Sequence, residues 1–585
     1  MRRKLLAAVL VVLLLVTGCA TVPTKGTIRS GSREGLAPDF GGVGVEAKPP
    51  RDGTQPLPLV NGFLEAMSDS RAFDVAREYM TPEAAAAWKP ESQTVVYEQQ
   101  RDAVTSLGAD QVQLKARKIA TIDERGSWIP AKVDDEMSFV FKLIKLDGEY
   151  RVASVPPGVY LGSNQLDPKL APRNLYFFTP ARDMLVPDPV YLPVNLSAGQ
   201  AATQLVQELL KGPTSRLGNG VVSLAPPGTE VQVSVPVEFG VATVALNDAV
   251  SALQDTERRL LAAQIVWTLN QINLRVKITV GGAPLLPDDP DVLPFSNFTQ
   301  YDPSVPNGAM TELYGLRGGK VQRIEGLDGA SDIAARPLKD SKLSDYVAES
   351  FAVNLRGDSG AVVTTHGGDD VVAYSWLDST DKPDPVRTIP TQGRVLRPSY
   401  DNHDNLWILD RADATPRLRV RDRDGKLAEV TTSFRGDTPL VLRMAPDGVR
   451  ALLVMRSKTT GKNYVQTGTI QTAAESRLVL GPLRLLQLPL EDITDAAWHK
   501  QGLLVAGSSK SVSKSPWLVN TDGSQLQLLP GATVEFATDE LASNLNKDTL
   551  PVIQDVQGHL HWQTRDLTWV NMDEAGAPID PTYPG

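Results

Sequence analysis

The sequence predicts a multidomain protein in which two α+β domains precede a long all-β region. Three observations support this fold class. Helical apolar patterns open the first folded segment and strand patterns follow them, which is the order expected of an α+β domain. A second mixed segment comes next, and beyond residue 310 short apolar runs alternate with turns rich in Gly, Asp and Asn. At 585 residues the chain has room for about four domains.

Composition and charge exclude several classes of function. The chain has 59 Lys and Arg residues against 69 Asp and Glu residues, so a basic nucleic-acid surface is not expected. Cys19 is the single cysteine, which excludes disulfides within the chain and thiolate metal cages. Five histidines leave little scope for imidazole acid–base catalysis near neutral pH. We therefore expect no catalytic residues.

The first 18 residues have the parts of a secretory signal peptide. Residues 2–4 are basic, and the apolar run over residues 5–16 is shorter than the about 20 residues that a transmembrane helix needs. The segment Val16-Thr17-Gly18-Cys19 resembles the bacterial lipobox. That resemblance implies cleavage between Gly18 and Cys19, with N-palmitoyl and S-diacylglycerol groups on Cys19 that anchor the chain stably. An ordinary signal peptide followed by a chance cysteine is the alternative.

Residues 19–55 are expected to form a lipidated tether. The stretch 23–58 is rich in Gly and Pro and has no apolar periodicity. A flexible chain of this length reaches about 35 Å, which would hold the folded body away from the membrane. The alternative is a coil that packs against the first domain.

The first folded domain is expected over residues 56–165. Apolar residues recur at helical spacing from Leu59 to Met67, and Thr81-Pro82-Glu83 combines an N-cap, a first-position proline and an acidic first turn. Strand patterns follow at 111–121, 137–146 and 150–155, the last two joined by an Asp147-Gly148 hairpin turn. The arrangement resembles the cone-shaped α+β domains of the nuclear transport factor 2 type, which often hold a pocket.

The second domain is expected over residues 175–287 as a second α+β unit. Its predicted elements are strands at 175–179 and 190–192, a helix at 201–210, a hairpin of 230–237 with 241–246, a helix at 256–270 and a strand at 275–280. Five stretches resemble the GerMN, or germane, domain: 205–213, 225–229, 240–244, 264–269 and 276–282. The resemblance implies a partner-binding or envelope role and supplies no catalytic residues.

The third region, residues 310–585, is expected to be a β-propeller. Turns near residues 358, 403, 447, 501 and 557 follow apolar strands at spacings of about 45 to 55 residues, which suits blades of four strands each. We expect about six blades. The stretch 444–454 resembles the strand–turn–strand core of TolB-type propellers. A pair of β-sandwiches is the alternative.

Together these segments resemble the LpqB family, actinobacterial lipoproteins that accompany the MtrA–MtrB two-component system. Residues 19–23 and 63–66 also fit the family. The resemblance implies a lipid-anchored protein on the extracytoplasmic face of the cell membrane that is not an enzyme. It would bind the sensor domain of an MtrB-type histidine kinase and influence cell-envelope homeostasis and division, through residues that the sequence does not identify.

Two alternative functions stay open at this point. One is an envelope ligand-binding protein or enzyme that holds a glycan, lipid or peptide in the propeller channel or in the pocket of the first domain. The other is a structural tether to the cell wall. Converging pairs of acidic side chains would favour the enzyme, and the sequence offers none at a telling spacing.

Two short motifs resemble reactive sites, and both are interpreted as turns. Gly357-Asp358-Ser359-Gly360 resembles a serine-protease nucleophile, but the first histidine, His366, follows it, whereas that family places its histidine before the serine. Gly318-Gly319-Lys320 lacks the Ser or Thr that ends a phosphate-binding loop.

Possible metal ligands are sparse, so neither a metal nor a cofactor is expected. Asp422-Arg423-Asp424-Gly425 resembles the start of a calcium loop without its later ligands, and Asp401, Asp404 and Asp410 are equally scattered. His559 and His561 share a strand face, but no third zinc ligand is evident. The acidic run Asp288-Asp289-Pro290-Asp291 is interpreted as a solvated linker.

Overall fold

The computed structural model describes residues 47–69, 73–132, 134–304, 310–327, 333–338, 341–377, 385–532, 537–572 and 579–585. The expected signal peptide and the lipobox, with Gly18 and Cys19, lie outside these described residues. Within the described part of the chain, no helix is long and apolar enough to cross a membrane.

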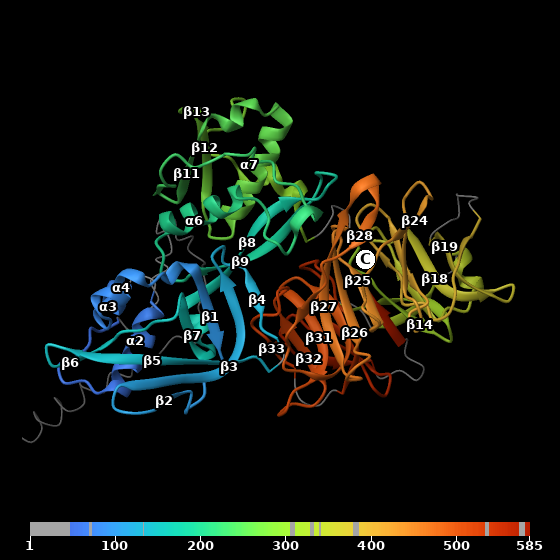
Figure 1. Cartoon of the computed structure of the whole chain (residues 1–585). Helices are drawn as coiled ribbons and strands as arrows, with labels where there is room; N and C mark the ends of the chain where they lie inside the picture. Colours follow the sequence, from blue (N-terminus) through green and yellow to red (C-terminus); the bar gives the residue numbers. More distant parts are fainter. Residues whose placement is uncertain are drawn as a thin grey trace, which may run out of the picture. The chain divides into compact units, whose positions relative to one another are not determined.

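The first domain combines three short helices with one sheet (Figure 1). Its helices are α2 (Pro56–Met67), α3 (Phe73–Glu78) and α4 (Pro82–Ala87); its strands are β1 (Gln93–Tyr97), β2 (Val104–Ser106), β3 (Gln111–Asp123), β4 (Trp128–Pro130), β5 (Glu136–Leu146), β6 (Glu149–Val152) and β7 (Val159–Gly162). The sheet has the order β6-β5-β3-β1-β7, with β2 and β4 paired to β3. Helix α2 contacts β3, β6 and β7, so the core of the domain lies between this helix and the sheet.

Local sequence chemistry positions these elements as predicted. The Thr81 side chain accepts a hydrogen bond from the Ala84 amide at 3.2 Å, and Pro82 occupies the first turn of α4. Asp147 and Gly148 both have positive φ, at 50° and 88°, as the tight turn between β5 and β6 requires.

Part of the expected tether is packed against this domain. The Tyr79 hydroxyl donates to the Lys48 carbonyl at 2.7 Å, and the Gly53 amide donates to Glu149 Oε2 at 2.8 Å. For residues 47–55 the packed coil, rather than the free tether, is therefore the correct alternative.

The second domain follows through the short helix α5 (Leu166–Lys169). Its elements are β8 (Leu170–Phe178), β9 (Leu185–Pro193), α6 (Ala198–Leu210), β10 (Val237–Glu238), β11 (Val241–Leu246), α7 (Asp255–Asn270), β12 (Arg275–Val280) and β13 (Ala283–Pro284). Strands β8 and β9 form one hairpin, and a second sheet has the order β10-β11-β12-β13 with β11 and β12 parallel. Helices α6 and α7 contact each other and β8, and α7 also contacts β12, which encloses the core.

The strand predicted over residues 230–237 is wrong for most of its length. Only Val237–Glu238 pairs regularly with β11, although the Gln232 amide still donates to the Ala245 carbonyl at 2.9 Å. Val233 is 86% exposed, and Pro236 has no amide hydrogen to donate. The segment therefore runs beside β11 without forming a regular ladder.

The third region consists of antiparallel sheets of short strands (Figure 1). Six sheets are formed among the described residues. The first sheet consists of β14 (Leu313–Arg317), β15 (Lys320–Glu325), β16 (Ala334–Pro337) and β38 (Ile579–Thr582); the second of β17 (Ser350–Val353), β18 (Ser359–His366), β19 (Asp369–Trp376) and β20 (Arg387–Pro390); and the third of β21 (Ser399–Tyr400), β22 (Leu406–Asp410), β23 (Arg417–Arg421) and β24 (Leu427–Val430). The fourth sheet consists of β25 (Thr438–Met444), β26 (Arg450–Arg456), β27 (Asn463–Thr472), β28 (Leu478–Leu480) and β29 (Arg484–Leu486); the fifth of β30 (Glu491–His499), β31 (Gly502–Ser508), β32 (Ser515–Val519) and β33 (Gln527–Leu528); and the sixth of β34 (Thr538–Ala542), β35 (Val552–Asp555), β36 (Leu560–Gln563) and β37 (Trp569–Asn571).

These sheets form a closed ring. The first strands of consecutive sheets contact one another from β17 through β21, β25 and β30 to β34, and β38 contacts both β34 and β17. Strand β38 also pairs with β14, so the last strand of the chain completes the sheet that β14 begins. Ring closure excludes the alternative of two β-sandwiches and protects the strand edges of the sheets.

One of the five predicted turns occupies a different place from the others. The turns near residues 358, 403, 447 and 501 each join the first strand of a sheet to the second. The turn near residue 557 joins β35 to β36, which are the second and third strands of their sheet. A local turn sequence such as Gln557-Gly558 does not reveal which pair of strands it joins.

Candidate functional site

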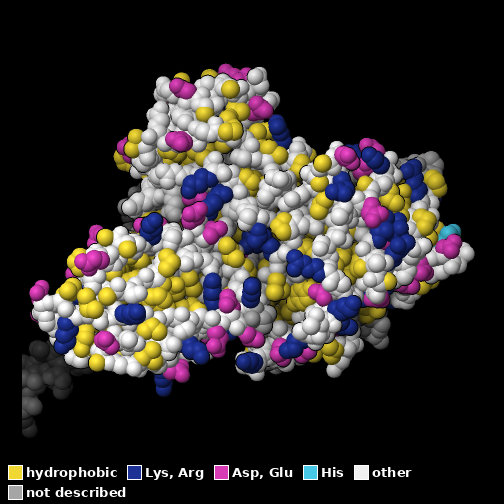
Figure 2. Space-filling view, viewed as in Figure 1, with side chains coloured by type: hydrophobic (Ala, Val, Ile, Leu, Met, Phe, Trp, Pro, Cys, Tyr) yellow, Lys and Arg dark blue, Asp and Glu magenta, His cyan; other side chains and the backbone are white. Residues whose placement is uncertain are grey.

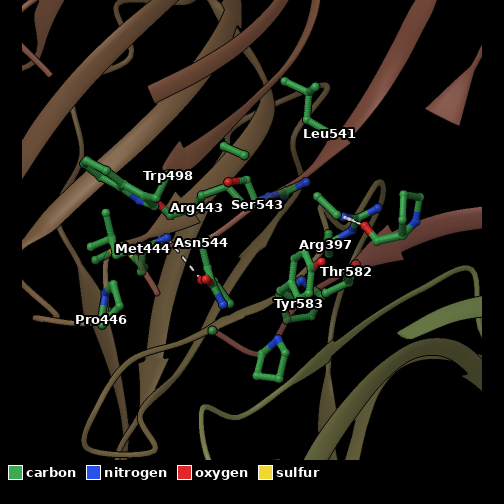
Figure 3. Close-up of a pocket in the computed structure, with 18 residues that line it drawn as sticks. Arg397, Arg443, Met444, Pro446, Trp498, Leu541, Ser543, Asn544, Thr582 and Tyr583 are labelled. Atoms are coloured by element: carbon green, nitrogen blue, oxygen red, sulfur yellow. Dashed lines mark hydrogen bonds between the residues drawn. The ribbon is translucent and has the colours of Figure 1, made fainter. Parts of the chain in front are cut away.

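The innermost strands of the ring enclose a narrow cavity (Figure 3). Side chains from β21, β25, β30, β34 and β38 line it, among them Arg443, Trp498 and Thr582, together with Arg397 just before β21. The cavity volume is about 50 Å³. That space holds a few water molecules, whereas pockets for drug-sized ligands have volumes of at least about 300 Å³. Protein side chains therefore leave little free space among these residues.

Charged side chains in the channel are paired between different sheets of the ring. Arg397 forms an ion pair with Asp580 and lies 3.6 Å from Glu540, measured from Nη2 to Oε2. Arg443 Nη2 lies 3.6 Å from Asp495 Oδ1, and Asp495 Oδ2 accepts a hydrogen bond from the Leu541 amide at 2.9 Å. The three carboxylates thus face arginines. Asp495 joins the fourth, fifth and sixth sheets, whereas Arg397, at the start of the third sheet, reaches the first and the sixth.

Burial shifts the ionisation of two of these groups. It lowers the pKa of Arg397 to about 10, so this guanidinium still carries its charge near neutral pH. Burial also raises the pKa of Glu540, although the charge of Arg397 acts in the opposite direction. Paired carboxylates and permanently charged arginines favour a structural role for the network over proton transfer.

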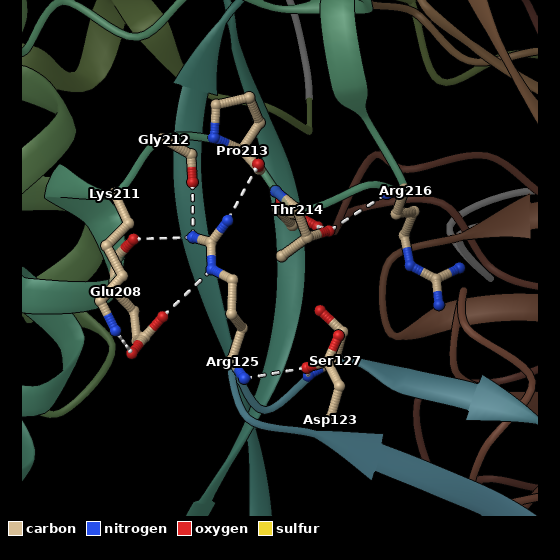
Figure 4. A network of polar contacts seen from close by, with 10 residues as sticks. Asp123, Arg125, Ser127, Glu208, Lys211, Gly212, Pro213, Thr214 and Arg216 are labelled. Atoms are coloured by element: carbon tan, nitrogen blue, oxygen red, sulfur yellow. Dashed lines mark hydrogen bonds and ion pairs between the residues drawn. The ribbon is translucent and has the colours of Figure 1, made fainter. Parts of the chain in front are cut away.

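A second polar cluster joins the first domain to the second (Figure 4). Arg125 lies in the turn between β3 and β4, and its guanidinium points at the C-terminal end of α6. It donates to the carbonyls of Glu208 at 3.0 Å, Gly212 at 2.7 Å and Pro213 at 3.1 Å, and to Glu208 Oε2 at 3.3 Å. The last carbonyls of a helix have no partner within the helix and carry partial negative charge, so a cation from another domain is an effective cap.

The turn that carries Arg125 also requires a glycine. Gly126 has a φ of +80°, and a methyl group at its Cα would lie 2.8 Å from the Tyr191 carbonyl oxygen on β9. The Tyr191 amide donates to the Gly126 carbonyl at 2.8 Å. Backbone of the first domain therefore packs directly on backbone of the second.

The second domain is in turn bound to the propeller. His403 Nε2 lies 2.6 Å from Asp183 Oδ2, and the Tyr191 hydroxyl donates to Ser524 Oγ at 2.5 Å. Arg484 Nη2 donates to the Ser215 carbonyl at 2.6 Å. The hydrogen bond to Asp183 raises the pKa of His403, so protonation of the imidazole strengthens this contact.

The two motifs interpreted as turns do lie in hairpins. Ser359 begins β18, and its hydroxyl donates to the Ser375 carbonyl at 3.2 Å. Gly318 and Gly319 form the turn between β14 and β15, with φ of 59° and 72°. Lys320 directs its Nζ to the carbonyls of Ser344 and Tyr346, not toward the glycine turn.

The scattered aspartates do not converge on a common point. Asp401 accepts hydrogen bonds from the Asn405 amide and the Trp407 indole, while Asp410 binds Arg417 and Arg419. Asp422 Oδ1 accepts the Lys426 amide within its own hairpin. No group of three potential metal ligands occurs among the residues that the structure describes.

The histidine pair shares a carboxylate. Asp555 Oδ2 lies 3.2 Å from His559 Nδ1 and 3.0 Å from His561 Nε2, and Asn571 contacts the other nitrogen of His561. Both ring nitrogens of His561 are thus engaged by protein groups. That Asp555 joins the two histidines was not predicted from the sequence.

The interpretation of the acidic run as a solvated linker is wrong in part. Asp289 forms an ion pair with Arg259 on α7 at 2.5 Å, and Asp291 pairs with Lys277 on β12 at 2.8 Å. Further on, Phe298 is buried in the core of the second domain, and its carbonyl accepts the Trp267 indole hydrogen. The run thus follows the surface of this domain.

Sequence reasoning did not identify Arg125, Arg397 or Arg443. Arg125 and its partners are separated by 83 to 88 positions. An arginine in a surface turn has no sequence signal that distinguishes it from any other solvated arginine. Its partners become known only when the strands are paired.

Comparison with known proteins identifies the family. Three family profiles match consecutive parts of the chain: the N-terminal domain of lipoprotein LpqB at residues 49–167, the germane domain of sporulation and spore germination at 174–286, and the LpqB β-propeller domain at 326–584. Lipoprotein LpqB of Thermobifida fusca is 30% identical, over 72% of this chain and 68% of its own length. The chain belongs to the LpqB lipoprotein family.

Other relatives extend the match over nearly the whole chain. Lipoprotein LpqB of Streptomyces coelicolor is 28% identical over 98% of this chain and 96% of its own length. Among solved structures, TolB from Acinetobacter baumannii is similar over 48% of this chain, with 13% identity and a TM-score of 0.36, a likeness too distant to bear on function. The LpqB family is thus an envelope lipoprotein family with a germane domain and a C-terminal propeller.

Proposed function

We propose that this LpqB-family protein is a lipid-anchored, extracytoplasmic scaffold that binds the sensor domain of an MtrB-type histidine kinase and modulates its signalling. It is not an enzyme in this proposal. The observation that carries it is membership of the LpqB family over all three domains. A first domain of the nuclear transport factor 2 type and a six-bladed propeller belong to the same proposal.

The contacts between domains support the scaffold role. Arg125 and the His403–Asp183 pair fix the second domain to both of its neighbours. A rigid body presents its exposed loops at defined positions, and loops on rigid scaffolds commonly carry binding residues. Regulation requires that the protein bind two states of the kinase with different affinity, since equal binding shifts no equilibrium.

An exposed aromatic residue supports the second domain as the docking surface. Phe239 lies in the turn between β10 and β11, has a φ of +50°, and is 98% exposed. Nearby in the sequence, Val233 is 86% exposed. Aromatic side chains dominate the cores of protein interfaces, where each can contribute strongly to affinity.

Biolayer interferometry tests the docking. The mature chain from residue 19, with Cys19→Ser to prevent lipidation, is measured against the purified sensor domain of the cognate kinase. We expect saturable binding that Phe239→Ala weakens by at least about tenfold. Leu567→Ala serves as the matched control, because Leu567 is a half-exposed apolar residue in a turn of the propeller. Absence of saturable binding by the parent chain would contradict the proposal, and equal effects of the two variants would move the docking surface away from Phe239.

Cys19 is proposed as the lipidation site. Acyl chains on this residue would hold the protein at the membrane, and the Cys19→Ser chain should carry none of them. Mass spectrometry of the N-terminal peptide checks the diacylglyceryl and acyl groups directly. An unmodified, membrane-free parent protein would contradict the assignment.

The alternative is a protein that binds a small envelope ligand. The cavity of about 50 Å³ in the channel disfavours a glycan or lipid there. A ligand outside the channel stays compatible with the scaffold role.

A further inference from the structure

A basic hollow lies between the second and third sheets of the propeller, away from the central channel. Its volume is about 290 Å³, and its lining includes Arg356, Arg387, Arg421, Arg423, Tyr374 and Trp376. Figure 2 shows Lys and Arg side chains, with Asp and Glu among them, on the part of the propeller where Figure 1 places β19 and β24. In a chain with a net charge of −10, such a gathering of arginines needs a physical reason.

The acidic side chains in the hollow neutralise only one of these arginines. Asp358 Oδ2 lies 3.4 Å from Arg356 Nε, and Asp404 also pairs with Arg356. Asn354 Nδ2 donates to both carboxylates, at 2.7 and 2.8 Å. Both acids are thus committed to Arg356 and Asn354.

The other three arginines have no ion pair within the described residues. Neither Arg387, Arg421 nor Arg423 has a described carboxylate within the 4.0 Å of a salt bridge. The Arg421 guanidinium lies over the ring of Tyr374, 4.5 Å from its centroid, and its Nε is buried without a hydrogen-bond partner. Stacking on an aromatic ring fixes the orientation of this cation.

Two of these cations converge on one place. A methyl group at Gly425 would lie 3.8 Å from Arg421 Nη2 and 3.9 Å from Arg387 Nη1. The two guanidinium nitrogens are therefore less than about 8 Å apart, a separation at which like charges repel, and an anion between them would offset the repulsion. The planar guanidinium also offers paired N–H donors that match the oxygens of a phosphate or carboxylate.

We propose that this hollow binds the phosphate or carboxylate group of a small molecule between Arg387 and Arg421, with Arg423 at its rim. The site is separate from the channel and from the proposed docking residue Phe239. Its volume of about 290 Å³ is close to the lower end of the range for small-ligand pockets. Binding depends on charge, so affinity falls as salt concentration rises.

Isothermal titration calorimetry of the mature Cys19→Ser chain tests the site. Pyrophosphate and citrate serve as the phosphate and carboxylate probes, and glucose as the neutral control. We expect one molecule of at least one anionic probe to bind per chain, and no binding of glucose. Arg387→Gln with Arg421→Gln should weaken binding by at least about thirtyfold, as loss of two charge-assisted contacts implies. Arg477→Gln is the matched control at an exposed arginine elsewhere in the propeller and should bind within about twofold of the parent chain.

The outcomes separate the possibilities. Pyrophosphate binding alone assigns a phosphate ligand, citrate binding alone assigns a carboxylate ligand, and either supports the site. The proposal is overturned if neither anion binds, or if the Arg477→Gln chain loses as much affinity as the Arg387→Gln, Arg421→Gln chain. The single variant Arg387→Gln covers the case in which the double variant does not fold. Arg387 is exposed, so its replacement should leave the fold intact, and it should still lower the affinity about tenfold.

Discussion

Replacing Arg125 by alanine should loosen the first domain from the second. The change removes three hydrogen bonds to carbonyls at the end of α6 and the contact with Glu208, whose side chain is 9% exposed. Hydrogen bonds to charged groups contribute about 1.5–3 kcal/mol each when buried, and breaking a buried ion pair costs about 3–5 kcal/mol. The Arg125 side chain is 23% exposed, and Lys211 stays paired with Glu208 at 2.6 Å, so solvent and Lys211 offset part of the loss. We expect a net cost of about 3 kcal/mol.

Hydrogen–deuterium exchange measures this cost at the C-terminal end of α6. In the Arg125→Ala chain, protection of amides at the end of α6 should fall about 100-fold, which corresponds to about 3 kcal/mol. Arg125→Lys keeps the charge but not the fork of donors, so it should restore only part of the protection. Arg182→Ala is the control: its ion pair with Glu257 is exposed and should contribute less than about 1 kcal/mol. Equal exchange in the Arg125→Ala and Arg182→Ala chains would refute the reasoning.

Three further predictions concern pH and ring closure. The hydrogen bond with Asp183 raises the pKa of His403, and the hydrogen bonds from His403 and Thr179 outweigh burial and lower the pKa of Asp183. Their contact should therefore be strongest between about pH 4 and 6.5, where both groups are charged. The protection factors of amides at the β8–β9 turn should fall on either side of that window, and protection factors that do not change with pH would contradict the pairing. Burial lowers the pKa of His499 from 6.5 to about 4, so the unfolded chain gains its proton first, and the propeller should lose up to about 3 kcal/mol of stability as pH falls across that range. His499→Gln should flatten this part of the stability–pH curve measured by denaturant unfolding, and an unchanged slope would argue against it. Removing residues 579–585 deletes β38 and should lower the melting temperature of the propeller by at least about 10 °C by circular dichroism, whereas an unchanged temperature would mean that the ring is closed in another way.

Elements set by local chemistry could be predicted from the sequence. Thr81-Pro82-Glu83 caps α4, and Asp147-Gly148 turns β5 into β6, because each depends on side chains and backbone freedom within a few residues. The segment at 230–237 shows the limit of this approach. Its apolar residues suggest a strand, but the exposed Val233 and the missing donor of Pro236 break the ladder with β11.

Features that depend on distant pairing could not be predicted. The sixth sheet is one case. Gln557-Gly558 forms a tight turn, but this turn joins β35 to β36, the second and third strands of the sheet. The first and second strands, β34 and β35, are joined by the loop over residues 543–551. The basic hollow is a second case: Arg387 and Arg421 belong to different sheets and meet at Gly425 only once both sheets are in place. The pattern along each strand carries no sign of such convergence.

The central claim is that the protein changes the activity of a sensor kinase by binding it. The most direct test reconstitutes the lipidated, full-length protein with a full-length MtrB-type kinase in the same vesicles and measures the rate of kinase autophosphorylation. We expect the rate to change at least about twofold at saturation, in either direction, and Phe239→Ala to reduce that change. An autophosphorylation rate that stays the same at every ratio of the two proteins would contradict the account.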